Sequence, residues 1–173
     1  VRERALPCLI FVNKIDRSGA RPEAVLREIG SELGVDAIPL NVSLHAGTRA
    51  AATWPVDWTD PAAREEAVER LAPHAPWLLD AWATRDGAVE PAEMRAALQE
   101  AMAAGAAWPA VMGSAMTGAG IDDLLDALAR FAPEVRADPD APLRAEVFTV
   151  RRAPNGERLV VARIRSGVLR IRE

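Results

Sequence analysis

The sequence contains a single cysteine, Cys8, and has no apolar stretch long enough to cross a membrane. A membrane span needs about 18 consecutive apolar residues, whereas the longest run here, ALPCLIFV at 5–12, has the length of a buried strand. A lone cysteine cannot form an internal disulfide, and its position in this run indicates a buried thiol. No basic segment followed by an apolar core and a cleavage site indicates a secretory signal. We therefore expect a cytoplasmic, reducing setting and no membrane partner.

Charge is distributed unevenly along the 173 residues. The net charge is −4, yet residues 143–173 hold eight arginines against three glutamates. This asymmetry suggests two modules, the second of which could face a polyanion. Arginines on the solvent face of strands would give the same count, and that alternative stays open. Because the chain starts with Val1 and ends at Glu173 within an alternating pattern, we expect a piece of a longer protein.

Strand-like and helix-like periods alternate over the first 131 residues. A chain that alternates in this way is typical of a layered α/β domain with a largely parallel sheet. Ligands of such sheets bind at the carboxyl ends of the strands. Residues 43–60 show no clear period, and we expect a loop at 48–60. The pattern predicts strands at 6–12 and 37–42, a strand that runs into a turn at 108–115, and helices at 22–33, 61–72, 75–85, 91–104 and 121–131.

The period changes after the segment RADPDAP at 136–142, which has two prolines and no apolar periodicity. We interpret this segment as a linker. Beyond it the pattern alternates, and Asn155-Gly156 is a strong hairpin signal. About 31 residues are too few for a closed barrel, so residues 143–173 predict the start of an all-β unit.

The segment NKID follows the first predicted strand and has the residue types that recognise guanine. Guanine offers N1–H and its N2 amino group as adjacent donors, and the carboxylate of Asp16 can accept both. The aliphatic stem of Lys14 can cover a base face while its charge stays in water. Asn13 can join neighbouring loops through its amide. A purely structural alternative is that Asn13 and Asp16 cap the helix near Pro22.

A second small-residue turn, GSAMTGAG at 113–120, follows a later strand and precedes a helix. Its backbone N–H groups could donate to guanine O6, and Ser114 and Ala115 are small enough for close approach. Composition adds weight to the first motif, because Lys14 is the one lysine of a chain with 20 arginines. Arginine lacks a flexible aliphatic stem that ends in a compact ammonium group.

These segments resemble the guanine-recognition elements of translational GTPases of the elongation factor G family. The likeness is greatest to the paralogues that protect ribosomes from tetracycline, because NKIDRSGARPEAVLREI is similar and the insert between the two motifs is short. The segment from 141 to 173 resembles the start of the second, β-barrel domain. The resemblance implies that residues 1–135 belong to an incomplete P-loop-GTPase-type α/β parallel sheet, that 136–142 form a linker and that 143–173 are the first strands of a truncated antiparallel β-barrel.

The resemblance also implies roles for six residues toward GTP or GDP. Asn13, Lys14 and Asp16 would form the first base loop. Ser114 and Ala115 would form the second, with the Ala115 N–H toward O6 and Met116 beside the ring. The implied partner is the ribosome, with its RNA and proteins, and not DNA.

The phosphate-loop pattern G-x-x-x-x-G-K-[ST] does not occur in the sequence, and the one D-x-x-G spacing, Asp16 to Gly19, lies within the first base loop and is not a separate element for Mg²⁺ and the attacking water. These elements hold the phosphates, Mg²⁺ and the attacking water in phosphoryl transfer. We therefore expect the intact parent, but not the chain alone, to hydrolyse GTP, with Mg²⁺ held outside these residues. Two alternatives stay open: elongation factor G or another paralogue, and a non-catalytic guanine-binding or ribosome-binding module.

Overall fold

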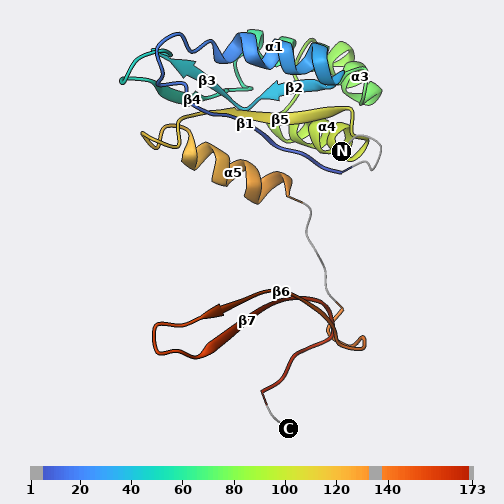
Figure 1. Ribbon diagram of the computed structural model, residues 1–173. Helices are drawn as coiled ribbons and strands as arrows, with labels where there is room; N and C mark the ends of the chain where they lie inside the picture. Colours follow the sequence, from blue (N-terminus) through green and yellow to red (C-terminus); the bar gives the residue numbers. More distant parts are fainter. Residues whose placement is uncertain (1–5, 133–137, 172–173) are drawn as a thin grey trace. The chain divides into compact units, whose positions relative to one another are not determined.

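The computed structural model describes residues 6–132 and 138–171 (Figure 1). The chain divides into two compact units, residues 1–132 and 133–173. The predicted linker, 136–142, lies partly outside the described residues.

A three-stranded parallel sheet is the centre of the first unit, with the strand order β1-β5-β2. Val12 pairs with Met112 on one side of β5, and Ile38 pairs with Pro109 on the other. Strands β3 and β4 form a separate antiparallel hairpin. The elements are β1 (Ile10–Val12), α1 (Pro22–Leu33), β2 (Asp36–Pro39), β3 (Asn41–Leu44), β4 (Ala52–Pro55), α2 (Pro61–Leu71), α3 (Pro76–Thr84), α4 (Pro91–Ala103), β5 (Ala107–Met112) and α5 (Ile121–Phe131).

Proline begins four of the five helices, because its fixed φ suits the first turn and its missing N–H would have no helical partner there. Helix α1 ends at Gly34, which has φ of +61° and donates its N–H to the Gly30 carbonyl at 2.9 Å. The five predicted helices are confirmed.

Both faces of the sheet are buried, and β5 is buried along its whole length. On one face Leu26 of α1 packs with Val12, Ala110 and Met112. On the other face Val111 belongs to a larger core that draws on α2, α3, α4 and α5. In Figure 1, α1 and α5 lie on opposite sides of the sheet. Coverage on both faces explains why β5 is a continuous apolar run.

Three expectations for this unit were wrong in detail. The first strand covers only 10–12 of the expected 6–12, since Pro7 has no N–H for a ladder. The single strand expected at 37–42 is two, because the Leu40 carbonyl turns to the Val56 N–H and the chain enters the hairpin. The loop expected at 48–60 contains β4.

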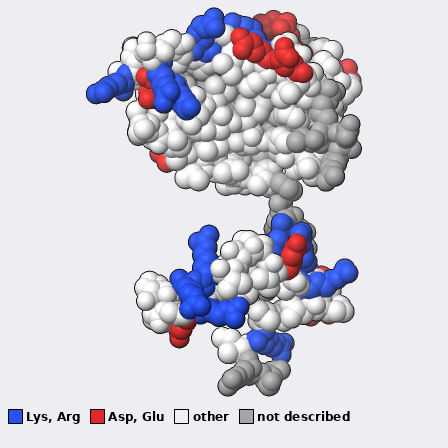
Figure 2. All heavy atoms as spheres, in the orientation of Figure 1, with Lys and Arg blue, Asp and Glu red and all other residues white. Residues whose placement is uncertain are grey.

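The second unit is an antiparallel pair, β6 (Arg144–Arg152) and β7 (Arg158–Ser166). The Ala153 N–H donates to the Glu157 carbonyl at 2.9 Å, and Gly156 has φ of +84° between them. The predicted hairpin is therefore confirmed, as is the α/β parallel sheet followed by antiparallel strands. Basic side chains prevail on the face of this hairpin seen in Figure 2.

Candidate functional site

Two loops meet at the carboxyl edge of the parallel sheet. The first loop, residues 13–20, follows β1, and the second loop, residues 113–120, follows β5. The Gly113 N–H donates to the Val12 carbonyl at 2.9 Å, and the Ile15 N–H donates to the Gly113 carbonyl at 3.2 Å. Because β1 and β5 are adjacent and parallel, their ends place both loops at the position where such sheets bind ligands.

Asn13 joins the two loops through its side chain. Its Oδ1 accepts the backbone N–H of Lys14 at 2.8 Å and the backbone N–H of Ala115 at 3.0 Å. The sequence suggested that this amide could tie neighbouring loops, and the geometry agrees. The helix-capping alternative does not hold, because no side chain caps α1, whose N-cap is Arg21.

Lys14 and Asp16 both present side chains at the edge of the first loop. Lys14 is exposed and has φ of +70°, a left-handed conformation that costs a non-glycine residue about 1–2 kcal/mol. Asp16 is half-buried, and its carboxylate makes no hydrogen bond or ion pair within residues 6–132 and 138–171. Between them Ile15 is 1% exposed and anchors the loop to the core. An anchored loop with an unpaired carboxylate is suited to accept donors from a ligand.

Ser114 is fully buried and shapes the second loop from within. Its Oγ accepts the Thr117 N–H at 3.2 Å, and its N–H donates to the Ala119 carbonyl at 2.8 Å. Ala115 is exposed, and Met116 is 86% exposed. The structure thus brings the six predicted residues to one edge, with the Ser114 side chain turned into the loop.

Two glycines keep the second loop close to the sheet. A Cβ on Gly113 would lie 2.5 Å from the Ala119 carbonyl oxygen, and a Cβ on Gly120 would lie 2.3 Å from that of Met112. Neither distance is tolerable between non-bonded atoms, so both positions require glycine.

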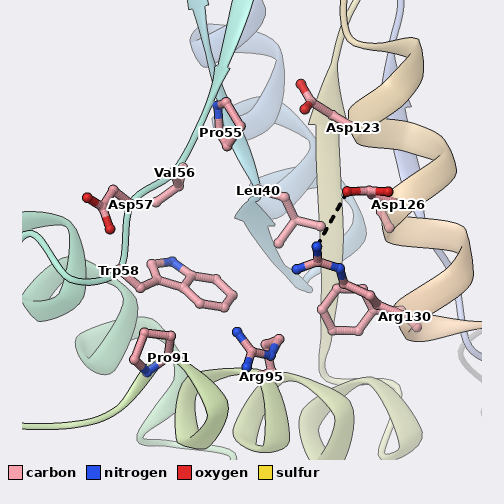
Figure 3. A pocket seen from close by; sticks show the side chains of 12 residues that line it. Leu40, Pro55, Val56, Asp57, Trp58, Pro91, Arg95, Asp123, Asp126 and Arg130 are labelled. Atoms are coloured by element: carbon pink, nitrogen blue, oxygen red, sulfur yellow. Dashed lines mark hydrogen bonds and ion pairs between the residues drawn. The ribbon is translucent and has the colours of Figure 1, made fainter.

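A separate cavity of about 270 Å³ lies between the β3–β4 hairpin and helices α4 and α5 (Figure 3). Trp58 and Phe131 supply apolar walls, and Arg130 pairs with Asp126 at 3.4 Å. On the rim, the pKa of Asp57 is lowered because its carboxylate accepts the hydroxyl and N–H of Thr59. None of the six predicted residues lines this cavity.

Sequence reasoning missed one polar cluster beside the second loop. Asn41 is fully buried and contacts both the end of β5 and Asp123, which also accepts the Thr53 hydroxyl. Asn41 lies within the strand predicted at 37–42, and Asp123 stands in the first turn of a helix, where an acidic residue suits the helix dipole, so neither carried a signal. In the part of the chain that the structure describes, no three His, Cys, Asp or Glu side chains gather as a metal site. No described helix has the length and apolar character of a membrane span.

The family described as elongation factor Tu GTP binding domain matches residues 1–134. The chain belongs to this family. Its relatives include an oxytetracycline resistance protein of Streptomyces rimosus, 40% identical over the whole chain, and the tetracycline resistance protein TetM of Streptomyces lividans, 33% identical over 96% of it. Elongation factor G of Fervidobacterium nodosum is 26% identical over 95%.

A solved structure from Thermus thermophilus covers 95% of the chain with a TM-score of 0.69 and 22% identity, which supports the fold. It is matched over 28% of its own length. The elongation factor Tu GTP-binding family match and these relatives agree on an α/β translational GTPase fold. The chain spans only 26% of each of the two resistance proteins and 30% of the elongation factor G.

Proposed function

We propose that this chain recognises the guanine base of GTP and GDP for a ribosome-dependent translational GTPase. The observation that carries the proposal is the Asn13–Ala115 hydrogen bond, which holds the two loops together beside the carboxylate of Asp16, a group with no partner among the described residues. A base seated there would meet an acceptor from the first loop and backbone donors from the second.

Each proposed contact follows from the chemistry of guanine. Asp16 would accept N1–H and the N2 amino group, and the stem of Lys14 would cover one face of the ring. The Ala115 N–H would donate to O6, sharing its hydrogen with the Asn13 oxygen that accepts it in the structure. Met116, exposed beside Ala115, would cover the ring edge when the base is bound. Ser114 would act indirectly, by shaping the loop.

Hydrolysis of GTP to GDP and phosphate, with Mg²⁺, is proposed for the full-length protein. No residue of this chain is assigned to the phosphates, the metal or the attacking water. The part played by these 173 residues is therefore base selection, which decides which nucleotide reaches the catalytic elements.

Ribosomal protection against tetracycline is the activity we propose for the full-length protein. Identity to the two resistance proteins is 40% and 33%, against 26% to elongation factor G. The proposed partner is the ribosome, through its RNA and proteins, and the basic β6–β7 hairpin is suited to phosphate contacts (Figure 2). Expression of the complete reading frame should raise the tetracycline concentration that stops growth of a sensitive bacterium, and unchanged sensitivity would contradict this activity.

The variant Asp16→Asn tests base recognition in the full-length protein. Asparagine replaces one acceptor oxygen with a donor, which suits xanthine because xanthine has an oxygen where guanine has its N2 amino group. Affinity for GTP should fall at least about 100-fold and affinity for xanthosine triphosphate should rise, since such buried pairing discriminates by up to ~10⁴-fold. Asp80→Asn, on the exposed face of α3, is the matched control. GTP affinity within about threefold of the parent would remove Asp16 from the site.

A further inference from the structure

Asn41 completes the sheet at the point where β5 runs into the second loop. The β2–β5 ladder ends at the pair Pro39 and Ala110, with the Leu40 N–H donating to the Ala110 carbonyl at 2.8 Å. The Leu40 carbonyl accepts the Val56 N–H instead of continuing along β5. Met112, the last residue of β5, therefore has no strand opposite it on this side.

The amide of Asn41 supplies both missing partners. Its Oδ1 accepts the Met112 N–H at 2.8 Å, and its Nδ2 donates to the Met112 carbonyl at 2.9 Å. A primary amide has the same donor and acceptor as a peptide group, so the side chain replaces one step of a ladder. Aspartate could not donate, and glutamine would place its amide one methylene further from the backbone.

The second hydrogen of Asn41 Nδ2 fixes the other end of the loop. It is donated to Asp123 Oδ2 at 2.7 Å, and the Thr53 hydroxyl donates to the same oxygen at 2.9 Å. Asp123 lies in the first turn of α5, directly after the second loop. In Figure 3 its carboxylate points away from Arg95 and Arg130 of the cavity, as these hydrogen bonds require.

One buried side chain thus holds the residue before the second loop and the helix after it. We infer that Asn41, together with Asp123, is a positioning residue that directs the Ala115 N–H toward guanine O6. This inference rests on the proposed function, because it assumes that a guanine base occupies the site. Asn41 touches no part of the ligand and acts through the second loop.

The test separates O6 recognition from overall stability in the full-length protein. Dissociation constants are measured by competition with a fluorescent GDP for GDP, inosine diphosphate and 2-aminopurine riboside diphosphate. The inosine nucleotide lacks only the N2 amino group read by Asp16, whereas the 2-aminopurine nucleotide lacks both O6 and the N1–H that Asp16 also accepts. Because Asp16 is the same in the parent and in these variants, a change in the preference for GDP over the 2-aminopurine nucleotide reports on O6. The variants are Asn41→Ala and the milder Asp123→Ala, whose half-exposed side chain leaves the Asn41–Met112 pair intact. Leu78→Ala, in the core of α3, is the stability control.

We expect both variants to reduce the preference for GDP over the 2-aminopurine nucleotide by about fivefold, the size of one weakened hydrogen bond. The preference for GDP over inosine diphosphate should stay within about twofold of the parent, because the first loop is untouched. Leu78→Ala should lower the melting temperature while changing neither preference. If the three affinities fall together in the Asn41 and Asp123 variants, as a loss of folded protein would require, the inference is overturned.

The failure of the inference differs from the failure of the proposed function. If the parent protein prefers GDP and Asp16→Asn prefers the xanthine nucleotide, while Asp123→Ala keeps both preferences, only the positioning role is lost. If the parent protein shows no preference for GDP over the 2-aminopurine nucleotide, the proposed function and the inference fall together.

Discussion

The side-chain oxygen of Asn13 lies 3.0 Å from the backbone nitrogen of Ala115, which is 102 residues further along the chain, and accepts its hydrogen bond. The same oxygen accepts the N–H of Lys14 at 2.8 Å. A single atom therefore fixes the start of the first loop and its distance from the second. Geometry at the two loops should change together when this atom is removed.

Replacing Asn13 by alanine should accelerate GDP release about 30-fold, the equivalent of about 2 kcal/mol. Two backbone N–H groups lose their acceptor, and each such bond contributes about 1 kcal/mol to the ordered state. Stopped-flow release of a fluorescent GDP measures the rate. Asn13→Asp keeps the acceptor oxygen and should release GDP more slowly than Asn13→Ala. Equal rates for the two variants would show that the oxygen does not hold the loops.

Two glycines of the second loop offer a matched pair. Gly118 and Gly120 both have positive φ, but a Cβ on Gly118 meets nothing within 4 Å. Gly118→Ala should lower the free energy of unfolding by about 1–2 kcal/mol, the cost of the left-handed conformation alone. Gly120→Ala adds a clash with the Met112 carbonyl oxygen and should cost about 3 kcal/mol or more. Urea denaturation measures both, and equal losses would refute the close approach.

Stability and binding should separate in the variant Lys14→Gly. Glycine removes the strain of φ at +70° but adds freedom to the unfolded chain, and both effects are about 1 kcal/mol. The free energy of unfolding should therefore change by less than about 1 kcal/mol, whereas GTP affinity should fall because the aliphatic stem is gone. Arg17→Gly, at an exposed position of the same loop, is the control for glycine's flexibility and should leave GTP affinity unchanged. Unchanged GTP affinity in Lys14→Gly would remove the stem from the site.

The start of α4 should be sensitive to acid. The pKa of Glu93 is lowered because its carboxylate accepts the Glu90 backbone N–H at 3.0 Å and a hydrogen bond from Arg85 at 2.9 Å. A depressed pKa means that the stabilisation is present above the ordinary value of 4.5 and is lost as the pH falls through the lower folded value. The melting temperature of Glu93→Gln should lie below that of the parent at about pH 7, and the difference should narrow as the pH falls below 4.5. Glu65→Gln, on an exposed turn of α2, should show no such convergence.

The helices were predictable because their signals are local. Pro22, Pro61, Pro76 and Pro91 each stand at a helix start, and Gly34 follows a helix end. The short hairpin strands gave no such signal. Each has four residues, too few for an alternating period to show, and β4 includes Trp54 and Pro55 with exposed side chains.

The candidate site divides in the same way. The residue types of NKID and GSAM suit the proposed recognition of a base, and their places at strand ends could be predicted from the chain alone. The place of Asn41 could not be predicted in this way. Asn41 can bond the Met112 backbone because the Leu40 carbonyl accepts the Val56 N–H and the chain leaves β5 there. The point at which the chain leaves β5 is set by tertiary packing. The sequence pattern around an asparagine in an apolar segment does not indicate it.

The hydrogen bond from the Met112 N–H to the side chain of Asn41 also affects how fast this backbone proton exchanges with solvent. The Met112 N–H is bonded as if inside a sheet, although its partner is a rotatable side chain. Ladder amides usually exchange with solvent deuterium only when strands separate. The exchange rate at Met112 would instead follow a single side chain on the neighbouring hairpin, so this one proton is a local sensor for the order of the loop that begins beside it.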